Sequence, residues 1–309
     1  MALCGCAVHA ALQAAGKECM FEGFADIFVE TSGARIRVRH GGEGPPLLLL
    51  HGNPQTHVCW HRVAGRLAER YHVVATDLRG YGDSSAPEPD PDCANYSFRA
   101  MAQDQIEVMA ALGYSRFFLA GHDRGGRTAH RLLQDHPGIV EKCAILDILP
   151  SRHVWHNASR SWALKSFHWV FMAQPGGLPE AMMASVPREK FLEPMMVRPP
   201  AGRSIFTPEA WAEYVRCFTP KTIMASCADY RACATVDLAM DDADFGRKVE
   251  TPLLILWGVE SHTQAVFDDV LGVWRDYATD VQGGPIVSGH FIPEQAPDEV
   301  LARFEAFFV

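Results

Sequence analysis

The sequence predicts an α/β fold, in which a mostly parallel doubly wound sheet carries a helical cap inserted before the penultimate strands. Two observations predict it. Short continuous apolar runs recur along the chain, which is typical of parallel strands buried on both faces, and helical patterns lie between several of them. The continuous runs occupy residues 47–50, 73–76, 117–120, 143–146 and 253–256, two further short strands are expected at 27–30 and 35–38, and helical patterns lie at 101–112 and 127–134.

The second observation is an interruption of this rhythm. From Pro150 to about Glu250 no apolar strand run appears, and the segment is rich in Trp, Met and Pro. We therefore expect residues 1–22 to be an N-terminal extension, 23–149 and 251–309 to form the core, and 150–250 to be a helical cap. Open α/β sheets bind ligands at the carboxyl ends of their strands, and a cap inserted there would cover the site.

Composition excludes several classes of function. The chain has 309 residues and a net charge of −9 without long runs of like charge, which argues against a nucleic-acid surface. The nine cysteines have no metal-ligand spacing, and the closest pair, Cys4 and Cys6, has no partners nearby. No stretch has the features of a signal peptide or the length of a membrane span, so we expect a cytoplasmic protein without membrane contact, metal or cofactor.

The sharpest motif is Gly121-His122-Asp123-Arg124-Gly125, which directly follows a predicted strand and opens a helix. It fits the nucleophile elbow G-x-nucleophile-x-G, with Asp123 in the place of serine. The alternative is a strand-to-helix turn whose aspartate only caps the helix. After the strand at 47–50, His51-Gly52-Asn53-Pro54 lies where the α/β-hydrolase fold forms its oxyanion loop, so the N–H groups of Asn53 and Arg124 would form the hole.

A base and an acid complete the predicted set. Ser288-Gly289-His290 precedes a C-terminal helix, at the position where this fold keeps its catalytic histidine. Two carboxylates could orient His290: Asp147, which ends the strand at 143–146, and Glu260, which follows the strand at 253–256. The residues alone leave both open.

An aspartate nucleophile suits substrates other than ordinary esters. A carboxylate displaces a leaving group from saturated carbon and becomes an alkyl ester, which water activated by a histidine then hydrolyses. Halides and epoxides react in this way. Arg124 and Arg127 share a helix face beside Asp123, where cations oppose the helix dipole, and arginine binds carboxylates through paired N–H groups. The pair therefore favours an anionic haloacid over a neutral epoxide.

At this point the sequence resembles the fluoroacetate (haloacetate) dehalogenases, from about Phe21 to the C-terminus. The matching stretches are His51-Gly52-Asn53-Pro54-Gln55-Thr56-His57, Gly121-His122-Asp123-Arg124-Gly125-Gly126-Arg127, Leu146-Asp147-Ile148-Leu149-Pro150, Phe167-His168-Trp169, Asp229-Tyr230-Arg231-Ala232 and Ser288-Gly289-His290-Phe291.

The resemblance implies a role for each matching residue. It implies Asp123 as nucleophile, His290 as base and Asp147, in preference to Glu260, as the acid. It also implies that Arg124 and Arg127 hold the substrate carboxylate, that a halide pocket is formed by His168, Trp169 and Tyr230, and that the protein is a homodimer. Asn53 is a departure, because the family usually has Phe there; Asn is similar to haloalkane dehalogenases and bears on halide preference.

The sequence thus predicts hydrolysis of a haloacetate, fluoroacetate or chloroacetate, to glycolate and halide through an aspartyl ester. The nearest rival is an epoxide hydrolase with the same nucleophile and two cap tyrosines, for which Tyr214 and Tyr230 are candidates. A non-catalytic receptor on the same fold is the rival from another class, although a receptor need not keep a nucleophile, base and acid together.

Overall fold

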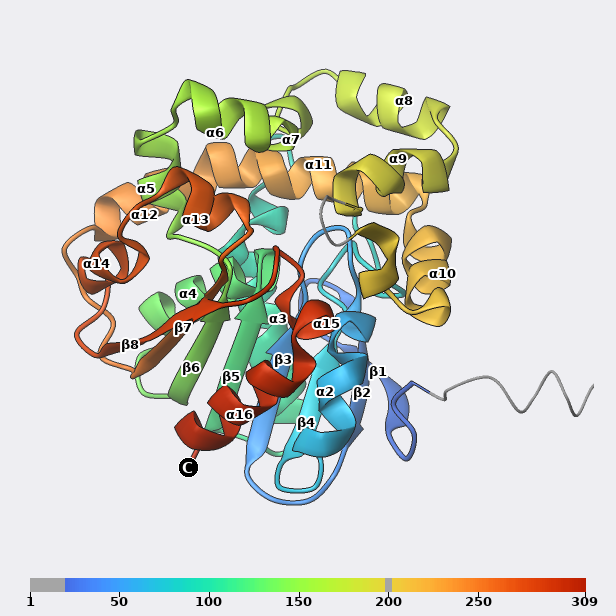
Figure 1. Cartoon of the computed structure of the whole chain (residues 1–309). Helices are drawn as coiled ribbons and strands as arrows, with labels where there is room; N and C mark the ends of the chain where they lie inside the picture. Colours follow the sequence, from blue (N-terminus) through green and yellow to red (C-terminus); the bar gives the residue numbers. More distant parts are fainter. Residues whose placement is uncertain (1–19, 198–201) are drawn as a thin grey trace, which may run out of the picture.

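The computed structural model describes residues 20–197 and 202–309, and its centre is an eight-stranded sheet. The strands are β1 (Ala25–Glu30), β2 (Arg35–Gly41), β3 (Pro46–Leu50), β4 (His72–Thr76), β5 (Phe117–His122), β6 (Val140–Leu146), β7 (Leu253–Gly258) and β8 (Val281–Ile286). Their order is β1-β2-β4-β3-β5-β6-β7-β8 (Figure 1). Only the pairs β1–β2 and β2–β4 are antiparallel, and the other neighbours are parallel. The mostly parallel sheet predicted from the sequence is confirmed.

Each predicted strand range lies in a strand, and the five continuous apolar runs are buried because the sheet is covered on both faces. Within β3, Leu47 and Leu49 pack into one core cluster, whereas Leu48 and Leu50 pack into the other. Both side-chain directions of a central parallel strand thus need apolar residues, which explains the continuous run of leucines. The sequence did not locate β8, an edge strand in which Gly283, Gly284 and Pro285 obscure the apolar pattern.

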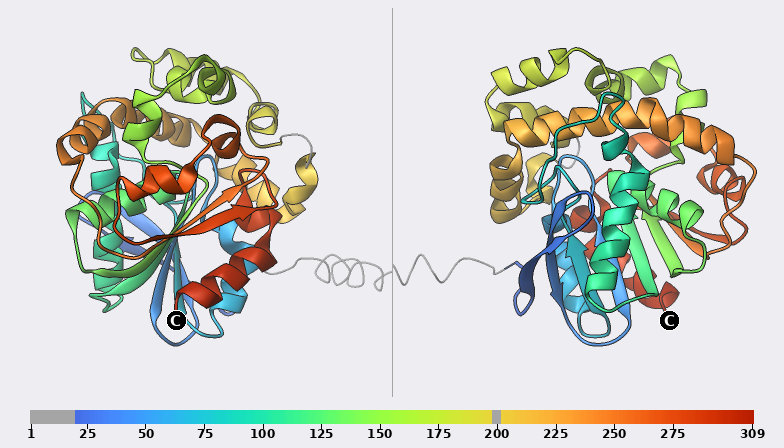
Figure 2. Two further views of the ribbon diagram at one scale, coloured as in Figure 1. Left: turned by 60° about the vertical axis from the view of Figure 1, so that its left-hand side comes forward. Right: turned by 180° about the vertical axis from the view of Figure 1, so that it is seen from behind.

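Helices form a layer on each face of the sheet. The helices outside the insertion are α2 (His61–Leu67), α3 (Phe98–Ala111), α4 (Arg124–Asp135), α13 (His262–Val266), α14 (Val270–Arg275), α15 (Ile292–Gln295) and α16 (Pro297–Phe307), with short 3-10 turns at η1 (His57–Trp60) and η2 (Ala94–Tyr96). Helices α2 and α16 lie against one face, and α3 and α4 cover the other (Figures 1 and 2). No helix in the described ranges is long and apolar enough to cross a membrane.

The described regular structure between β6 and β7 consists of helices joined by short loops. It contains α5 (Ser151–His156), α6 (Arg160–Lys165), α7 (Phe167–Met172), α8 (Leu178–Ser185), α9 (Arg188–Met196), η3 (Gly202–Ile205), α10 (Pro208–Cys217), α11 (Pro220–Ala234) and α12 (Val236–Asp244). We call these helices the cap, since they lie over the carboxyl ends of the strands (Figure 1). Its treatment as a separate domain at 150–250 stays a prediction. The predicted extension, 1–22, lies outside the described residues except for its last three.

The order of the strands determines where a site can form. The chain runs from β3 outward to β4 on one side and later to β5 on the other, so β3 lies at a topological switch point. The loops that follow β3 and β5 therefore meet in one crevice. Those that follow β6, β7 and β8 continue it along the same edge of the sheet, beneath the cap.

Candidate active site

Asp123 lies in the tight turn between β5 and α4, with φ 48° and ψ −115°. The flanking glycines allow strand and helix to approach. A Cβ atom on Gly121 would lie 2.4 Å from the carbonyl oxygen of Gly125, and one on Gly125 would lie 2.4 Å from that of Leu50. Asp123 occupies the N-cap position but makes no side-chain capping bond. Its carboxylate instead accepts the N–H of Asn53 at 3.0 Å. The alternative of an ordinary helix cap is therefore wrong.

The surroundings of Asp123 keep it ionised. Burial by itself would raise the pKa of its carboxyl group, but nearby histidine and arginine charges outweigh burial and hold that pKa below its ordinary value. A strained, buried and ionised carboxylate is a competent nucleophile.

His290 and Asp147 form a close pair beside Asp123. The Nδ1 atom of His290 lies 2.6 Å from Oδ2 of Asp147, and the backbone N–H of Gly258 donates to the other carboxylate oxygen at 3.0 Å. Asp147 is fully buried, and burial raises the pKa of its carboxyl group. The rival acid, Glu260, has an exposed side chain. Of the two candidates, the structure joins only Asp147 to the histidine.

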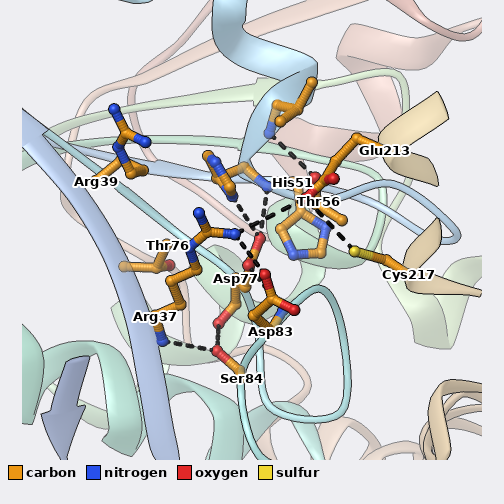
Figure 3. A network of polar contacts seen from close by, with 12 residues as sticks. Arg37, Arg39, His51, Thr56, Thr76, Asp77, Asp83, Ser84, Glu213 and Cys217 are labelled. Carbon is orange, nitrogen blue, oxygen red and sulfur yellow. Dashed lines mark hydrogen bonds and ion pairs between the residues drawn. The ribbon is translucent and has the colours of Figure 1, made fainter. Parts of the chain in front are cut away.

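The loop after β3 holds the N–H of Asn53 against the carboxylate of Asp123, and a polar network fixes that loop (Figure 3). The ring of His51 spans from the carbonyl oxygen of Gly52, 2.8 Å away, to the N–H of Leu78, 3.0 Å away. Asp77, at the end of β4, accepts both the backbone N–H and Nδ1 of His57, each at 2.8 Å. These contacts make the first half of the predicted oxyanion hole rigid. The contribution of the Arg124 N–H stays a prediction.

The two predicted carboxylate-binding arginines are both buried, but one is already paired. Arg124 donates through Nε to Asp229 at 2.9 Å and through Nη2 to the same carboxylate. Burial would lower the pKa of Arg124, and Asp229 outweighs it and raises that pKa. Arg127 donates through Nη1 to Ser151 at 2.9 Å and to the carbonyl oxygen of Leu149 at 3.0 Å. Among the described residues, Nη1 of Arg124 and Nε of Arg127 have no hydrogen-bond partner.

A small cavity lies between the cap and the strand ends. Its volume is about 20 Å³, little more than the roughly 10–15 Å³ that one water molecule needs. It is lined by Asn53, Pro54, Asp123, His168, Trp169, Met195, Tyr230, His262, His290 and Phe291. Asp123, His290 and the three predicted halide residues thus face one space. The arginines lie behind its aromatic wall.

The halide candidates come from two cap helices. His168 and Trp169 are in α7, and Tyr230 is in α11, with its ring 5.7 Å and 6.0 Å from theirs. The guanidinium carbon of Arg124 lies 4.2 Å from the centre of the Tyr230 ring, and that of Arg127 lies 4.4 Å from the centre of the Trp169 ring. Burial raises the pKa of Tyr230, so its hydroxyl stays a hydrogen-bond donor.

Sequence reasoning gave no role to four further buried or cavity-lining groups. Asp229 pairs with Arg124, and His262 lines the cavity beside His290. The ring centre of His122 lies 4.7 Å from that of His290 with the two rings tilted, and burial lowers the pKa of His122 to about 4. Glu294 is fully buried and accepts from Tyr214 at 2.9 Å. Asp229 and His122 lie inside the quoted motifs, which could have signalled them; nothing in the sequence singled out His262 or Glu294.

Comparison with known proteins agrees with this geometry. Residues 45–189 match the family model described as the alpha/beta hydrolase fold. The chain is 42% identical over 289 residues to a fluoroacetate dehalogenase of Burkholderia sp, and the match covers 93% of this chain and 95% of that protein. It is 31% identical over 287 residues to a soluble epoxide hydrolase of Corynebacterium sp., covering 90% and 94%.

A solved structure extends the likeness to the whole fold. A protein of Nostoc sp PCC 7120 described as an alpha/beta hydrolase superposes with a TM-score of 0.90 at 46% identity, covering 94% of this chain and 99% of that one. The motifs that suggested the resemblance lie within the matched region. The chain belongs to the fluoroacetate dehalogenase family of α/β hydrolases.

Proposed function

We propose that this protein hydrolyses a haloacetate, fluoroacetate or chloroacetate, to glycolate and halide through a covalent ester on Asp123. The observation that carries the proposal is the shared cavity. An ionised Asp123, three hydrogen-bond donors of the cap and His290, which is paired with the buried Asp147, face one small cavity. The 42% identity to a fluoroacetate dehalogenase supports the same reaction.

In the first step the carboxylate of Asp123 attacks the carbon that bears the halogen. The carbon–oxygen bond forms as the carbon–halogen bond breaks, and the halide leaves with the electron pair. A departing fluoride loses strong hydration and needs several donors in its place. The imidazole of His168, the indole of Trp169 and the hydroxyl of Tyr230 supply these donors.

In the second step water attacks the carbonyl carbon of the ester. His290 accepts the proton of that water, and Asp147 stabilises the resulting imidazolium. The N–H of Asn53, which contacts Asp123 at 3.0 Å, stabilises the oxyanion. As the tetrahedral intermediate collapses, the imidazolium of His290 protonates the departing alkoxide oxygen to give glycolate, and the remaining proton of the water is released as Asp123 returns to its carboxylate.

The substrate carboxylate is assigned to the arginine pair. Arg124 and Arg127 have buried N–H groups without partners, at Nη1 and Nε respectively, in the described part of the chain. Both guanidinium groups lie against rings that line the cavity. A buried cation stabilises a buried anion far more strongly than an exposed one does, so Arg127, whose charge is not paired as that of Arg124 is with Asp229, would attract the substrate despite the net negative charge of the protein.

Epoxide hydrolysis is the second candidate, supported by Tyr230 in the cavity and by the relationship to the Corynebacterium enzyme. Its predicted partner, Tyr214, argues against it. The hydroxyl of Tyr214 donates to the buried Glu294, and Tyr214 is not among the described residues that line the cavity. One cavity tyrosine instead of two favours the haloacetate. A homodimer in the cytoplasm stays a prediction.

Halide release is the measurement that tests the proposal. Purified protein is incubated in parallel with fluoroacetate, chloroacetate and styrene oxide, with the Asp123→Asn variant as a matched control. We expect halide from at least one haloacetate, no epoxide opening, and no turnover by the variant once deamidation back to Asp has been excluded by mass. Epoxide opening without halide release would favour epoxide hydrolysis as the function. No turnover of either substrate class would favour a non-catalytic receptor.

A further inference from the structure

Three side chains that ligate metals in other proteins meet at the edge of the cavity. Asp147 follows β6, His262 is the first residue of α13 after β7, and His290 follows β8. Because these strands are neighbours in the sheet, the loops that follow them converge. One carboxylate oxygen and one ring nitrogen from each histidine lie within 4.8 Å of one another. The sequence has no ligand spacing here, since the three positions are far apart along the chain.

The geometry is close to that of a zinc site. Zinc binds imidazole nitrogen at about 2.0–2.1 Å and carboxylate oxygen at about 2.0–2.2 Å, which puts tetrahedral ligand atoms roughly 3.3 Å apart. The present separations are at most 4.8 Å, so modest ring rotations would close the set. Two imidazoles and a carboxylate suit Zn²⁺, and three protein ligands leave its fourth position to water.

An ion can also reach the cluster. His262 and His290 both line the cavity, and both are only partly buried, whereas Asp147 is fully buried behind them. The ion would therefore enter through the cavity. The negative charge of the buried Asp147 carboxylate would offset part of the positive charge of the ion.

We propose that Asp147, His262 and His290 form an inhibitory site for Zn²⁺. The inhibition rests on the proposed role of His290 as base. The ion takes Nδ1 of His290 and an oxygen of Asp147, in place of the 2.6 Å contact between them. The neutral imidazole keeps its one proton, which moves to Nε2, so no net proton is released. His290 then has no lone pair to accept a proton from water.

This arrangement predicts which half of the reaction stops. Attack by Asp123 on the substrate carbon needs no base, so the ester still forms and one halide is still released. Hydrolysis of the ester needs His290 as base, so turnover ends there. Zinc should therefore abolish steady-state release and leave a burst of about one halide per active site.

The kinetic test uses the full-length enzyme, freed of metal with a chelator, and chloroacetate as substrate. Zn²⁺ is titrated into the wild type, into His262→Gln, and into His72→Gln as a matched control. The control disrupts a different pair of neighbouring histidines, in which Nδ1 of His40 lies 3.0 Å from Nε2 of His72. Each rate is divided by the metal-free rate of the same variant. We expect His262→Gln to raise the half-inhibitory Zn²⁺ concentration at least about tenfold and His72→Gln to leave it unchanged.

A second readout is independent of turnover. Co²⁺ bound to two imidazoles and a carboxylate gives a ligand-field spectrum, which His262→Gln should abolish, whereas binding by thiolates would add sulfur-to-metal charge transfer. Equal zinc inhibition of wild type and His262→Gln, loss of the burst, or a thiolate spectrum would overturn the proposal. A Co²⁺ spectrum that depends on His262 in a protein without haloacetate turnover would leave the metal site intact and refute the proposed function instead.

Discussion

Replacing His290 by asparagine should separate the two steps of the proposed reaction. Asn cannot accept a proton from water, but the groups of the first step remain in place. Asp123 keeps the Asn53 N–H at 3.0 Å, and the three cap donors are unchanged by the substitution. The variant should therefore form the ester at a rate near that of the wild type and then stall.

The magnitude follows from the chemistry of each step. Loss of a general base reduces the rate of a step by about 10²–10⁴-fold, so hydrolysis becomes limiting. Mixed with excess chloroacetate, His290→Asn should release about one chloride per active site and then almost none. Intact-mass analysis should find an adduct of about 58 Da, a carboxymethyl group in place of a proton. Digestion should place this adduct on the peptide that contains Asp123.

The controls decide how the result is read. Asp123→Asn should release no chloride and gain no mass, and the double variant should behave in the same way. Continued turnover by His290→Asn well beyond one equivalent would show that another group activates water. A wild type that turns over, paired with a variant that neither releases chloride nor gains mass, would refute the two-step mechanism.

Three further variants test the surroundings of the site. Asp229→Ala leaves the buried charge of Arg124 without its counter-ion, so the free energy of unfolding in urea should fall by about 3–5 kcal/mol. Adding Arg124→Met should restore part of that free energy. No recovery would mean that the two side chains are not coupled. Burial raises the pKa of Asp241 to about 6, so the folded state binds this proton more tightly than the unfolded chain, and its stabilising contribution is lost as pH rises through 6. Asp241→Asn should accordingly raise the free energy of unfolding by up to about 3 kcal/mol at pH 8 and by little at pH 4, and an equal gain at both values would exclude ionisation as the cause. Asn53→Ala keeps the backbone N–H but removes Nδ2, which lies 3.5 Å from the hydroxyl of Tyr230; we expect kcat/KM for chloroacetate to fall about tenfold, the worth of one hydrogen bond, and unchanged kinetics would remove the amide from the halide site.

The sequence predicted the sheet well because its central strands are buried on both faces. The run Leu47 to Leu50 has no polar position, as a parallel strand covered by helices requires. At the edge of the sheet this requirement disappears. Strand β8 alternates exposed and buried positions and tolerates glycine and proline, so its pattern does not differ from that of a loop.

A residue of the candidate site could be predicted where its position depends on neighbours within the same motif. Asp123 lies between the glycines that allow its turn, and Asn53 is in the short loop that begins where a buried strand ends. The pairing of Arg124 with Asp229 was not predictable, because the partners are 105 positions apart, one in the elbow helix and one in the cap. Spacing along a single element reveals neighbours on that element, whereas contacts between elements depend on the packing of the whole chain.

That pairing changes how the charges of the site are understood. The sequence presented Arg124 and Arg127 as two equivalent cations for the substrate carboxylate. In the structure, Arg124 has a buried counter-ion, Asp229. The substrate would therefore meet one uncompensated arginine, Arg127, close to the negative Asp123. In the proposed first step the charge of Asp123 leaves with the halide, toward the donors of the cap. Alkylation thus removes the anion that opposes the bound carboxylate, so the buried site should hold the ester intermediate more tightly than it holds the substrate.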